Sequence, residues 1–163
     1  MKKIPSLACL LTMLTLQSCF WSPQESQNAS QYEPVLMNRV DFENSVQTLP
    51  PQSVIKSGKI YIKDNLMLVN DVNKGFHAYN YSDPENPMPI GFIKIPGATD
   101  LAIRDNTIYI NQAVDLVTLT YNPATNAIVL SNRNENVFPQ KMSPTGEEPL
   151  PSDDGIVVDW IEQ

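Results

Sequence analysis

The tetrapeptide Ile62-Lys63-Asp64-Asn65 returns as Ile103-Arg104-Asp105-Asn106, a spacing of 105 − 64 = 41 residues. Leu68-Val69-Asn70 returns as Tyr109-Ile110-Asn111 at the same spacing. A period of roughly 40–45 residues made of several short strands is typical of one blade of a β-propeller. The repetition therefore predicts an all-β chain that contains two propeller-like blades of about four antiparallel strands each.

Each copy contains four short runs of bulky or β-branched residues with turn residues between them, of which Asp64-Asn65 is the clearest. We expect strands at 59–63, 66–70, 76–81 and 90–95 in the first copy, and at 100–104, 107–111, 116–121 and 127–130 in the second. Val117 and Leu119 share one of these strands, beside Leu116. Because a two-sided sheet buries at least one face, we expect them to support stability.

The chain begins with Met1-Lys2-Lys3 and a largely apolar stretch from 4 to 16, a pattern that indicates an export signal too short to span a membrane. The signal ends in Leu16-Gln17-Ser18-Cys19, which resembles a bacterial lipobox. The resemblance implies cleavage after Ser18 and thioether lipidation of Cys19, with acyl chains such as palmitate anchoring the protein to the membrane. The alternative is an ordinary signal peptide with an incidental cysteine.

The remaining segments have distinct compositions. Asn38 is suited to cap a short helix with Asp41 in its first turn and Phe42 and Val46 on one face, although an irregular segment is the alternative. We expect a lipoprotein signal peptide at 1–18, a flexible tether and short helix at 19–48, the blades at 49–131 (about 58–98 and 99–131), and an acidic, proline-rich loop with a terminal strand at 132–163.

The charge balance is acidic. The chain has 11 Lys and Arg against 18 Asp and Glu, a net charge of −7, and cleavage after Ser18 would remove Lys2 and Lys3 and leave 9 − 18 = −9. A basic surface for nucleic acid is therefore not expected. Cys9 and Cys19 both precede the predicted blades, which excludes a disulfide framework or a cysteine metal site in the folded part.

The second copy contains Leu116-Val117-Thr118-Leu119-Thr120, and the first contains the stretch from Gly75 to Pro87. These stretches resemble the LVIVD-repeat family of β-propeller-like surface and secreted proteins, and most of all its lipoprotein members from Bacteroidetes-type bacteria, which implies this fold and export. Together with the lipobox pattern, we expect a lipid-anchored location in the cell envelope, at the outer membrane. Two blades cannot close a ring of about four to eight. We therefore consider a truncated reading frame, blades that assemble between chains, and a small open sheet.

No catalytic, cofactor or metal residues stand out. His77, the one histidine, lies within a predicted strand and is expected to pack across it. A calcium site in the acidic turns is the weaker reading, because the EF-hand spacing is absent. The turn and loop carboxylates concerned are Asp64, Asp71, Asp83, Glu85, Glu147, Glu148, Asp153 and Asp154. The strand tyrosines, expected to pack, are Tyr61, Tyr79, Tyr81, Tyr109 and Tyr121.

These features together predict a lipid-anchored envelope protein that acts in binding or scaffolding. Its expected partners are the membrane, through the lipid on Cys19, and a protein or glycan at the envelope. An envelope hydrolase or lyase on a propeller scaffold, or a non-functional fragment, are the alternatives. We also expect self-association through an uncovered apolar sheet face and the uncharged edges Ala127–Leu130 and Ile156–Val158.

Overall fold

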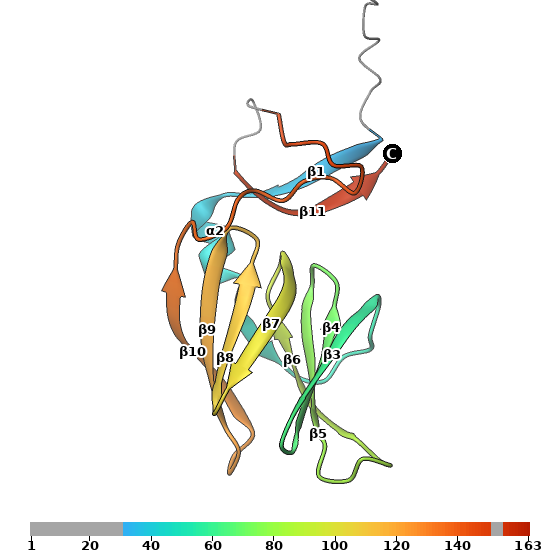
Figure 1. Ribbon diagram of the computed structural model, residues 1–163, viewed down its shortest axis with the longest axis vertical. Helices are drawn as coiled ribbons and strands as arrows, with labels where there is room; N and C mark the ends of the chain where they lie inside the picture. Colours follow the sequence, from blue (N-terminus) through green and yellow to red (C-terminus); the bar gives the residue numbers. More distant parts are fainter. Residues whose placement is uncertain (1–30, 151–154) are drawn as a thin grey trace, which may run out of the picture. The chain divides into compact units, whose positions relative to one another are not determined.

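The computed structural model describes residues 31–150 and 155–163 (Figure 1). Strands hold 55% of the described residues and helix 5%, which confirms the all-β prediction. Residues Tyr32–Gln163 form one compact unit. Cys19 and the export signal lie outside the described residues, so the lipidation of Cys19 stays a prediction.

The two repeats form two separate antiparallel sheets. The first has the order β2-β6-β5-β4-β3 and the second the order β10-β9-β8-β7. The first repeat contributes β3 (Ser57–Lys63), β4 (Leu66–Asp71), β5 (Gly75–Asn80) and β6 (Met88–Lys94). The second contributes β7 (Ala98–Arg104), β8 (Thr107–Gln112), β9 (Asp115–Asn122) and β10 (Ala127–Asn134). All eight predicted strands are confirmed.

The end of the second blade was placed too early by the sequence pattern. The prediction ended the blade at residue 131, but β10 continues to Asn134. The pairing of β10 with β9 shifts register between Leu130 and Asn132 and then resumes. Such a bulge breaks the local alternation of apolar and polar residues, which is why the continuation is not visible in the sequence.

One hydrophobic core lies between the two sheets. Leu68 and Phe76 of the first sheet and Ile110, Val117 and Leu119 of the second are at most 2% exposed and belong to the same cluster. Val117 and Leu119 are thus buried on one face of their sheet as expected, and their contribution to stability stays a prediction. The repeats therefore share a core as two stacked sheets, and the alternative of a single small open sheet is wrong.

The sheets stack in the same sense, as successive propeller blades do. Leu68 lies in the shared core, whereas its repeat counterpart Tyr109 lies on the outer side of the second sheet. Conversely, Ile108 lies in the core, whereas its counterpart Met67 lies on the outer side of the first sheet. We call the side of Leu68 and Tyr109 the front face and the side of Met67 and Ile108 the back face. The front face of the first sheet thus covers the back face of the second.

A two-stranded ribbon joins the beginning and end of the described chain. β1 (Tyr32–Met37) pairs antiparallel with β11 (Ile156–Glu162). The prediction of a flexible tether is wrong for residues 32–37, because they form a strand with β11. Their partner lies more than a hundred residues away in the sequence, so the local pattern does not reveal it. Ile156–Val158 are 0–6% exposed, so the prediction that they form an open edge is also wrong. The ribbon packs against Ala113 and Val114 in the turn between β8 and β9.

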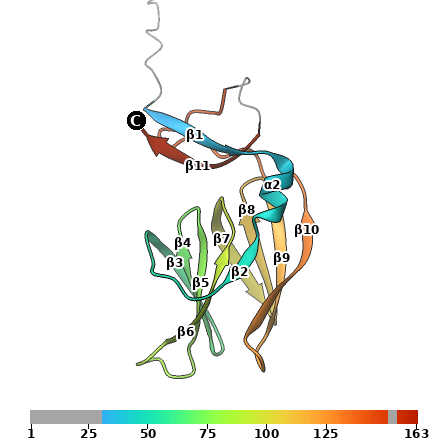
Figure 2. The same cartoon turned by 180° about the vertical axis from the view of Figure 1, so that it is seen from behind.

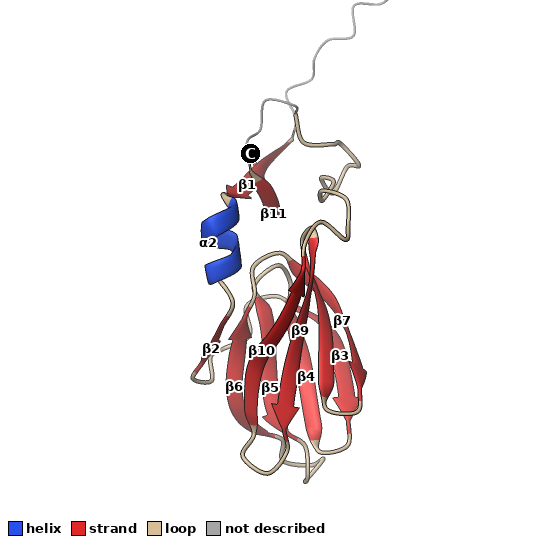
Figure 3. Cartoon of the chain, turned by 90° about the vertical axis from the view of Figure 1, so that its left-hand side faces the viewer, coloured by secondary structure: helices blue, strands red, loops and turns tan. Residues whose placement is uncertain are grey.

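The predicted helix is confirmed as α2 (Arg39–Asn44), coloured blue in Figure 3. Asn38 caps it, since its Oδ1 accepts a hydrogen bond of 2.9 Å from the Asp41 backbone N–H. The helix ends at Asn44 and so does not include Val46, which the prediction placed on its apolar face, because the chain turns into β2 (Gln47–Leu49), which pairs with β6. Residues 50–56 then cross from β2 at one edge of the first sheet to β3 at the other (Figure 2).

Residues 135–150 contain no strand or helix, in agreement with the predicted loop. Lys141 fastens this loop to the turns of the blades. Its Nζ donates to the Asn73 side chain and to the Gly97 carbonyl oxygen, the latter at 3.4 Å. Burial lowers the pKa of Lys141, although the nearby Asp159 carboxylate opposes this effect.

Candidate functional site

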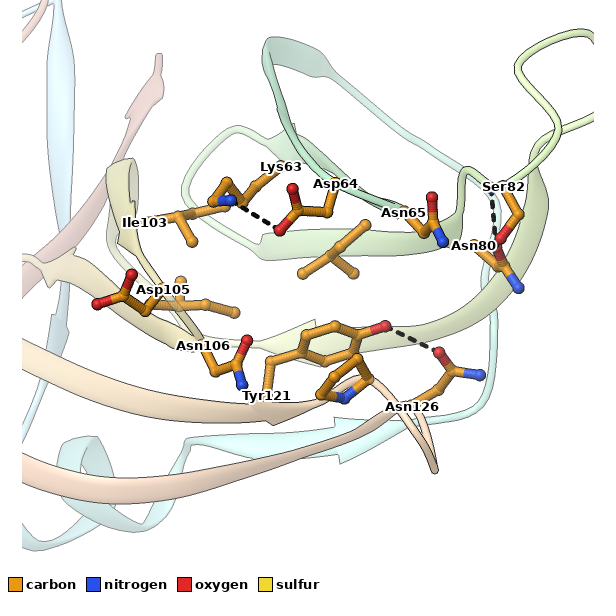
Figure 4. Close-up of a pocket in the computed structure, with 13 residues that line it drawn as sticks. Lys63, Asp64, Asn65, Asn80, Ser82, Ile103, Asp105, Asn106, Tyr121 and Asn126 are labelled. Atoms are coloured by element: carbon orange, nitrogen blue, oxygen red, sulfur yellow. Dashed lines mark hydrogen bonds and ion pairs between the residues drawn. The ribbon is translucent and has the colours of Figure 1, made fainter.

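The two Asp-Asn turns of the repeats lie beside each other at one end of the stacked sheets (Figure 4). Each connects its strands through two residues, and the first residue, Asp64 or Asp105, has φ of 53°. Aspartate tolerates this left-handed conformation better than most residues. The Asn65 carbonyl oxygen accepts from the Tyr81 N–H at 2.7 Å, and that of Asn106 from the Tyr121 N–H at 2.8 Å. Both repeats therefore contain the same turn, held by an equivalent backbone hydrogen bond.

A pocket of about 180 Å³ lies between these turns. The first sheet and its loops supply Lys63, Asp64, Asn65, Leu66, Asn80 and Ser82, and the second supplies Ile103, Asp105, Asn106, Ile108, Tyr121, Pro123 and Asn126. Leu66 and Ile108 also belong to the shared core. The volume is below the roughly 300–1,000 Å³ of pockets for drug-sized ligands. The pocket therefore suits a small molecule or the terminal group of a larger one.

Four asparagine amides surround this space. The Asn80 Oδ1 accepts from the Ser82 N–H at 2.9 Å and from its hydroxyl at 2.6 Å. The Asn126 Oδ1 accepts from the Tyr121 hydroxyl at 2.8 Å. These bonds occupy the carbonyl ends and leave the NH₂ ends as donors. The Asn65 and Asn106 side chains form no hydrogen bond among residues 31–150 and 155–163, so they offer both donors and acceptors.

The charged residues that line the pocket are one lysine and two aspartates. Lys63 Nζ lies 2.7 Å from the Asp64 Oδ2, and Asp105 adds one further carboxylate. Burial raises the pKa of Tyr121, which keeps its hydroxyl neutral at ordinary pH. The pocket is therefore equipped for hydrogen bonding to a neutral ligand more than for binding an ion.

His77 does not line this pocket. It is 2% exposed, and its ring centroid is 4.6 Å from that of Phe92, which confirms the predicted cross-strand packing. Its Nε2 also lies 3.1 Å from the Asp71 Oδ2, a buried contact that the sequence pattern did not reveal. With both side chains at most 3% exposed, neither is accessible to a substrate.

The acidic turn residues considered for calcium do not converge. Asp64 lies at the pocket, whereas Asp71 is buried at the other end of β4. The Asp83 carboxylate accepts from the Glu85 N–H at 3.1 Å and from the Asn86 amide at 3.0 Å, within one short loop. In the described part of the chain, no group of three His, Cys, Asp or Glu could hold a metal ion. Asp153 and Asp154 lie outside that part.

The tyrosines have two kinds of position. Tyr61 packs against the core and its hydroxyl donates to the Asp100 carboxylate, while Tyr121 combines core packing with the bond to Asn126. Tyr79 and Tyr109 are half-buried on the outer faces of the two sheets. The packing prediction holds for Tyr61 and Tyr121. The pocket itself was missed, although the duplicated Asp-Asn turn was a signal for it.

No family model, curated protein or solved structure matches this chain. Among the residues that the structure describes, no helix is long and apolar enough to cross a membrane.

Proposed function

We propose that this protein is a lipid-anchored β-repeat protein of the bacterial cell envelope that acts in binding. The lipobox pattern at Leu16–Cys19 and the resemblance to LVIVD-repeat proteins support the envelope location. The observation that carries the proposal is the pocket in which both copies of the Asp-Asn turn meet. Duplicated turns that converge on one space place equivalent polar groups on two sides of a ligand. A binding role needs only such a shaped, hydrogen-bonding space, which is what the repeat supplies.

The ligand class follows from the lining of the pocket. Asparagine amides can donate to and accept from hydroxyl groups, and four of them surround the space. The charges nearby are one ion pair and one carboxylate, which disfavours a strongly anionic ligand. A neutral sugar, free or at the end of an envelope glycan, has the hydroxyl groups and the size that this pocket accommodates.

The ribbon of β1 and β11 and the pocket lie at opposite ends of the stacked sheets. Tyr32 begins β1, and the ribbon of β1 and β11 packs on the turn between β8 and β9. The pocket is formed by turns at the other ends of these strands, such as Asp105-Asn106. Figure 1 shows the ribbon and the β9–β10 turn at opposite ends of the sheets. β1 therefore begins at the end of the sheets away from the pocket, which leaves the pocket end free of the ribbon.

The anchor is tested by detergent phase partitioning of the full chain after expression in a bacterium. We expect the wild-type chain in the detergent phase and Cys19→Ala in the aqueous phase, because the acyl chains supply most of the membrane affinity. Cys9→Ala, which changes the other cysteine, should partition like the wild type. Equal partitioning of the Cys19→Ala and wild-type chains would disprove the anchor.

The pocket is tested by titrating the protein with glucose, galactose and N-acetylglucosamine and following amide NMR shifts. We expect shifts at the two Asp-Asn turns for at least one sugar, and their loss in the double variant Asn65→Ala, Asn106→Ala. Asn132→Ala is the matched control, because this exposed asparagine of β10 lies outside the pocket lining. Unchanged sugar binding by the double variant, or no turn shifts with any of the three sugars, would contradict a sugar site here.

A further inference from the structure

The back face of the first sheet carries an uncovered apolar surface. One cross-strand row consists of Ile62, Met67 and Tyr79, and the next row contains Ile60 and Val69. Ile60 is 61% exposed and Ile62 is 54% exposed, while the other three are half-buried. We call these five residues the back-face patch. Soluble proteins rarely leave such contiguous apolar surface without a binding partner.

In the second repeat, the equivalent surface is covered by another sheet. The counterparts of Ile62, Met67 and Tyr79 are Ile103, Ile108 and Leu119, which form the same cross-strand row in the second sheet. The counterparts of Ile60 and Val69 are Leu101 and Ile110. All of these counterparts belong to or pack against the core, covered by the front face of the first sheet. The same positions are thus buried against a sheet in one blade and exposed in the other.

The segment of residues 50–56 covers only part of this back face. The Ile55 and Lys56 N–H groups each donate to the Asp71 carboxylate at 2.9 Å, which holds the segment against this face beside Asp71. His77 and Phe92, on the same face, are at most 5% exposed. The segment leaves the row of Ile62 open and adds an exposed apolar side chain, Ile55, which is 82% exposed.

The sheet faces restrict how another copy of this chain could cover the patch. In every copy the front face of the first sheet is already buried in the core. The front face of the second sheet is mainly polar, with Arg104, Thr120 and Asn132 exposed and Val129 as its main exposed apolar residue. If copies stacked head to tail, the back-face patch of one copy would meet the front face of the second sheet of the next. This contact would bury polar groups and a charge against the patch, which is unfavourable.

We propose that the back-face patches of two copies of this chain pack against each other in a closed, two-fold symmetric dimer. The five patch residues carry no charge, so pairing the patch with itself places no like charges in contact despite the acidic chain. A two-fold interface uses the same surface on both copies and leaves no patch open for further growth. Two of the five patch residues, Ile60 and Ile62, lie in the edge strand β3, so the interface reaches the margin of the first sheet.

The test is sedimentation of the full, lipidated chain in detergent micelles, with the protein mass separated from the bound detergent. We expect the wild type to have twice the protein mass of one chain. Ile62→Glu and, independently, Ile60→Glu introduce a charge on exposed side chains, so the fold should persist, as circular dichroism would check. We expect each to raise the dimer dissociation constant by at least about tenfold, because symmetry places the change on both sides of the interface.

Val129→Glu is the matched control, since Val129 is 61% exposed on the front face of the second sheet. It should remain a dimer with the wild-type dissociation constant. A wild-type chain that stays monomeric at about 100 µM would overturn the proposal, as would a series of ever larger assemblies. The proposal would also be overturned if Val129→Glu dissociated the dimer while Ile60→Glu and Ile62→Glu left it intact. The interface would then lie on the second sheet.

Discussion

The Asp71 carboxylate and the His77 imidazole form a buried pair on the back face of the first sheet, with Oδ2 and Nε2 3.1 Å apart. The same carboxylate accepts hydrogen bonds from the Ile55 and Lys56 N–H groups. Burial by itself raises the pKa of Asp71, but the two backbone N–H groups and His77 outweigh it, so that the pKa is lowered. One carboxylate thus fastens the crossing segment to the sheet.

This pair predicts a loss of stability in acid. Because the pKa of folded Asp71 lies below its unfolded value of about 3.9, the stabilisation is present above that pH and is lost as the pH falls through the folded pKa. Asp71→Asn should lower the free energy of unfolding at pH 7 by about 1–3 kcal/mol and reduce its slope between about pH 5 and pH 3. Urea unfolding across this range measures both. Asp105→Asn, in an exposed turn, is the control, and equal slopes for Asp71→Asn and wild type would contradict the assignment.

Leu119→Ala should destabilise the shared core. Leu119 is 2% exposed between the two sheets, and truncating a buried leucine costs about 2–5 kcal/mol through lost burial and the cavity that remains. Val129→Ala, on the neighbouring strand but 61% exposed, should change the free energy of unfolding by no more than about 0.5 kcal/mol. Chemical denaturation of both variants gives the comparison. Similar midpoints for the two would mean that the sheets do not share a core.

Asp115→Ala should be among the most destabilising changes in the chain. The Asp115 side chain is 0% exposed, and its Oδ2 lies 2.7 Å from the Nη1 atoms of both Arg39 and Arg133. Removing one partner of a buried ion pair costs about 3–5 kcal/mol, because the remaining charges lose their compensation. Arg133→Met should cost more than Arg39→Met, since the Arg133 side chain is 12% exposed and that of Arg39 is 33% exposed. Thermal unfolding ranks the three variants, and the reverse order of the two arginine variants would contradict this reading.

The Tyr61 hydroxyl connects the two repeats by donating to the Asp100 carboxylate. Burial, and then this hydrogen bond, raise the pKa of Tyr61 to about 12. Because the folded pKa is above the unfolded value of about 10, this contribution to stability is present below pH 10 and is lost as the pH rises toward 12. Ultraviolet titration of the wild type should show a tyrosine that ionises near pH 12, and Tyr61→Phe should lose this step while Tyr121, whose pKa burial also raises, keeps its own. The same late step in Tyr61→Phe would assign it to another tyrosine.

Local sequence determined the strands of both repeats. Each predicted strand combines residues that favour extended backbone with a turn that fixes its end, and Asp64-Asn65 and Asp105-Asn106 are such turns. Helix capping is equally local, so Asn38 identified the start of α2 correctly. These features depend on neighbours within a few residues, which is why they were predictable.

Pairing over long distances was decided by the tertiary structure. Residues 32–37 look like part of a polar linker until β11 supplies their hydrogen-bonding partner. Gln47–Leu49 similarly become a strand because β6 has a free edge beside them. A strand gains its backbone hydrogen bonds from its partner, so its own sequence does not reveal a partner more than a hundred residues away.

The pocket and the back-face patch also arise only when the sheets stack. The repeat predicted two equivalent turns, but their meeting in one pocket depends on how the first sheet covers the second. Ile62 and Ile103 occupy the same repeat position, yet Ile103 packs against the core and Ile62 is 54% exposed. Periodicity assigns a residue to a face of its own sheet, whereas burial depends on which other sheet packs against that face.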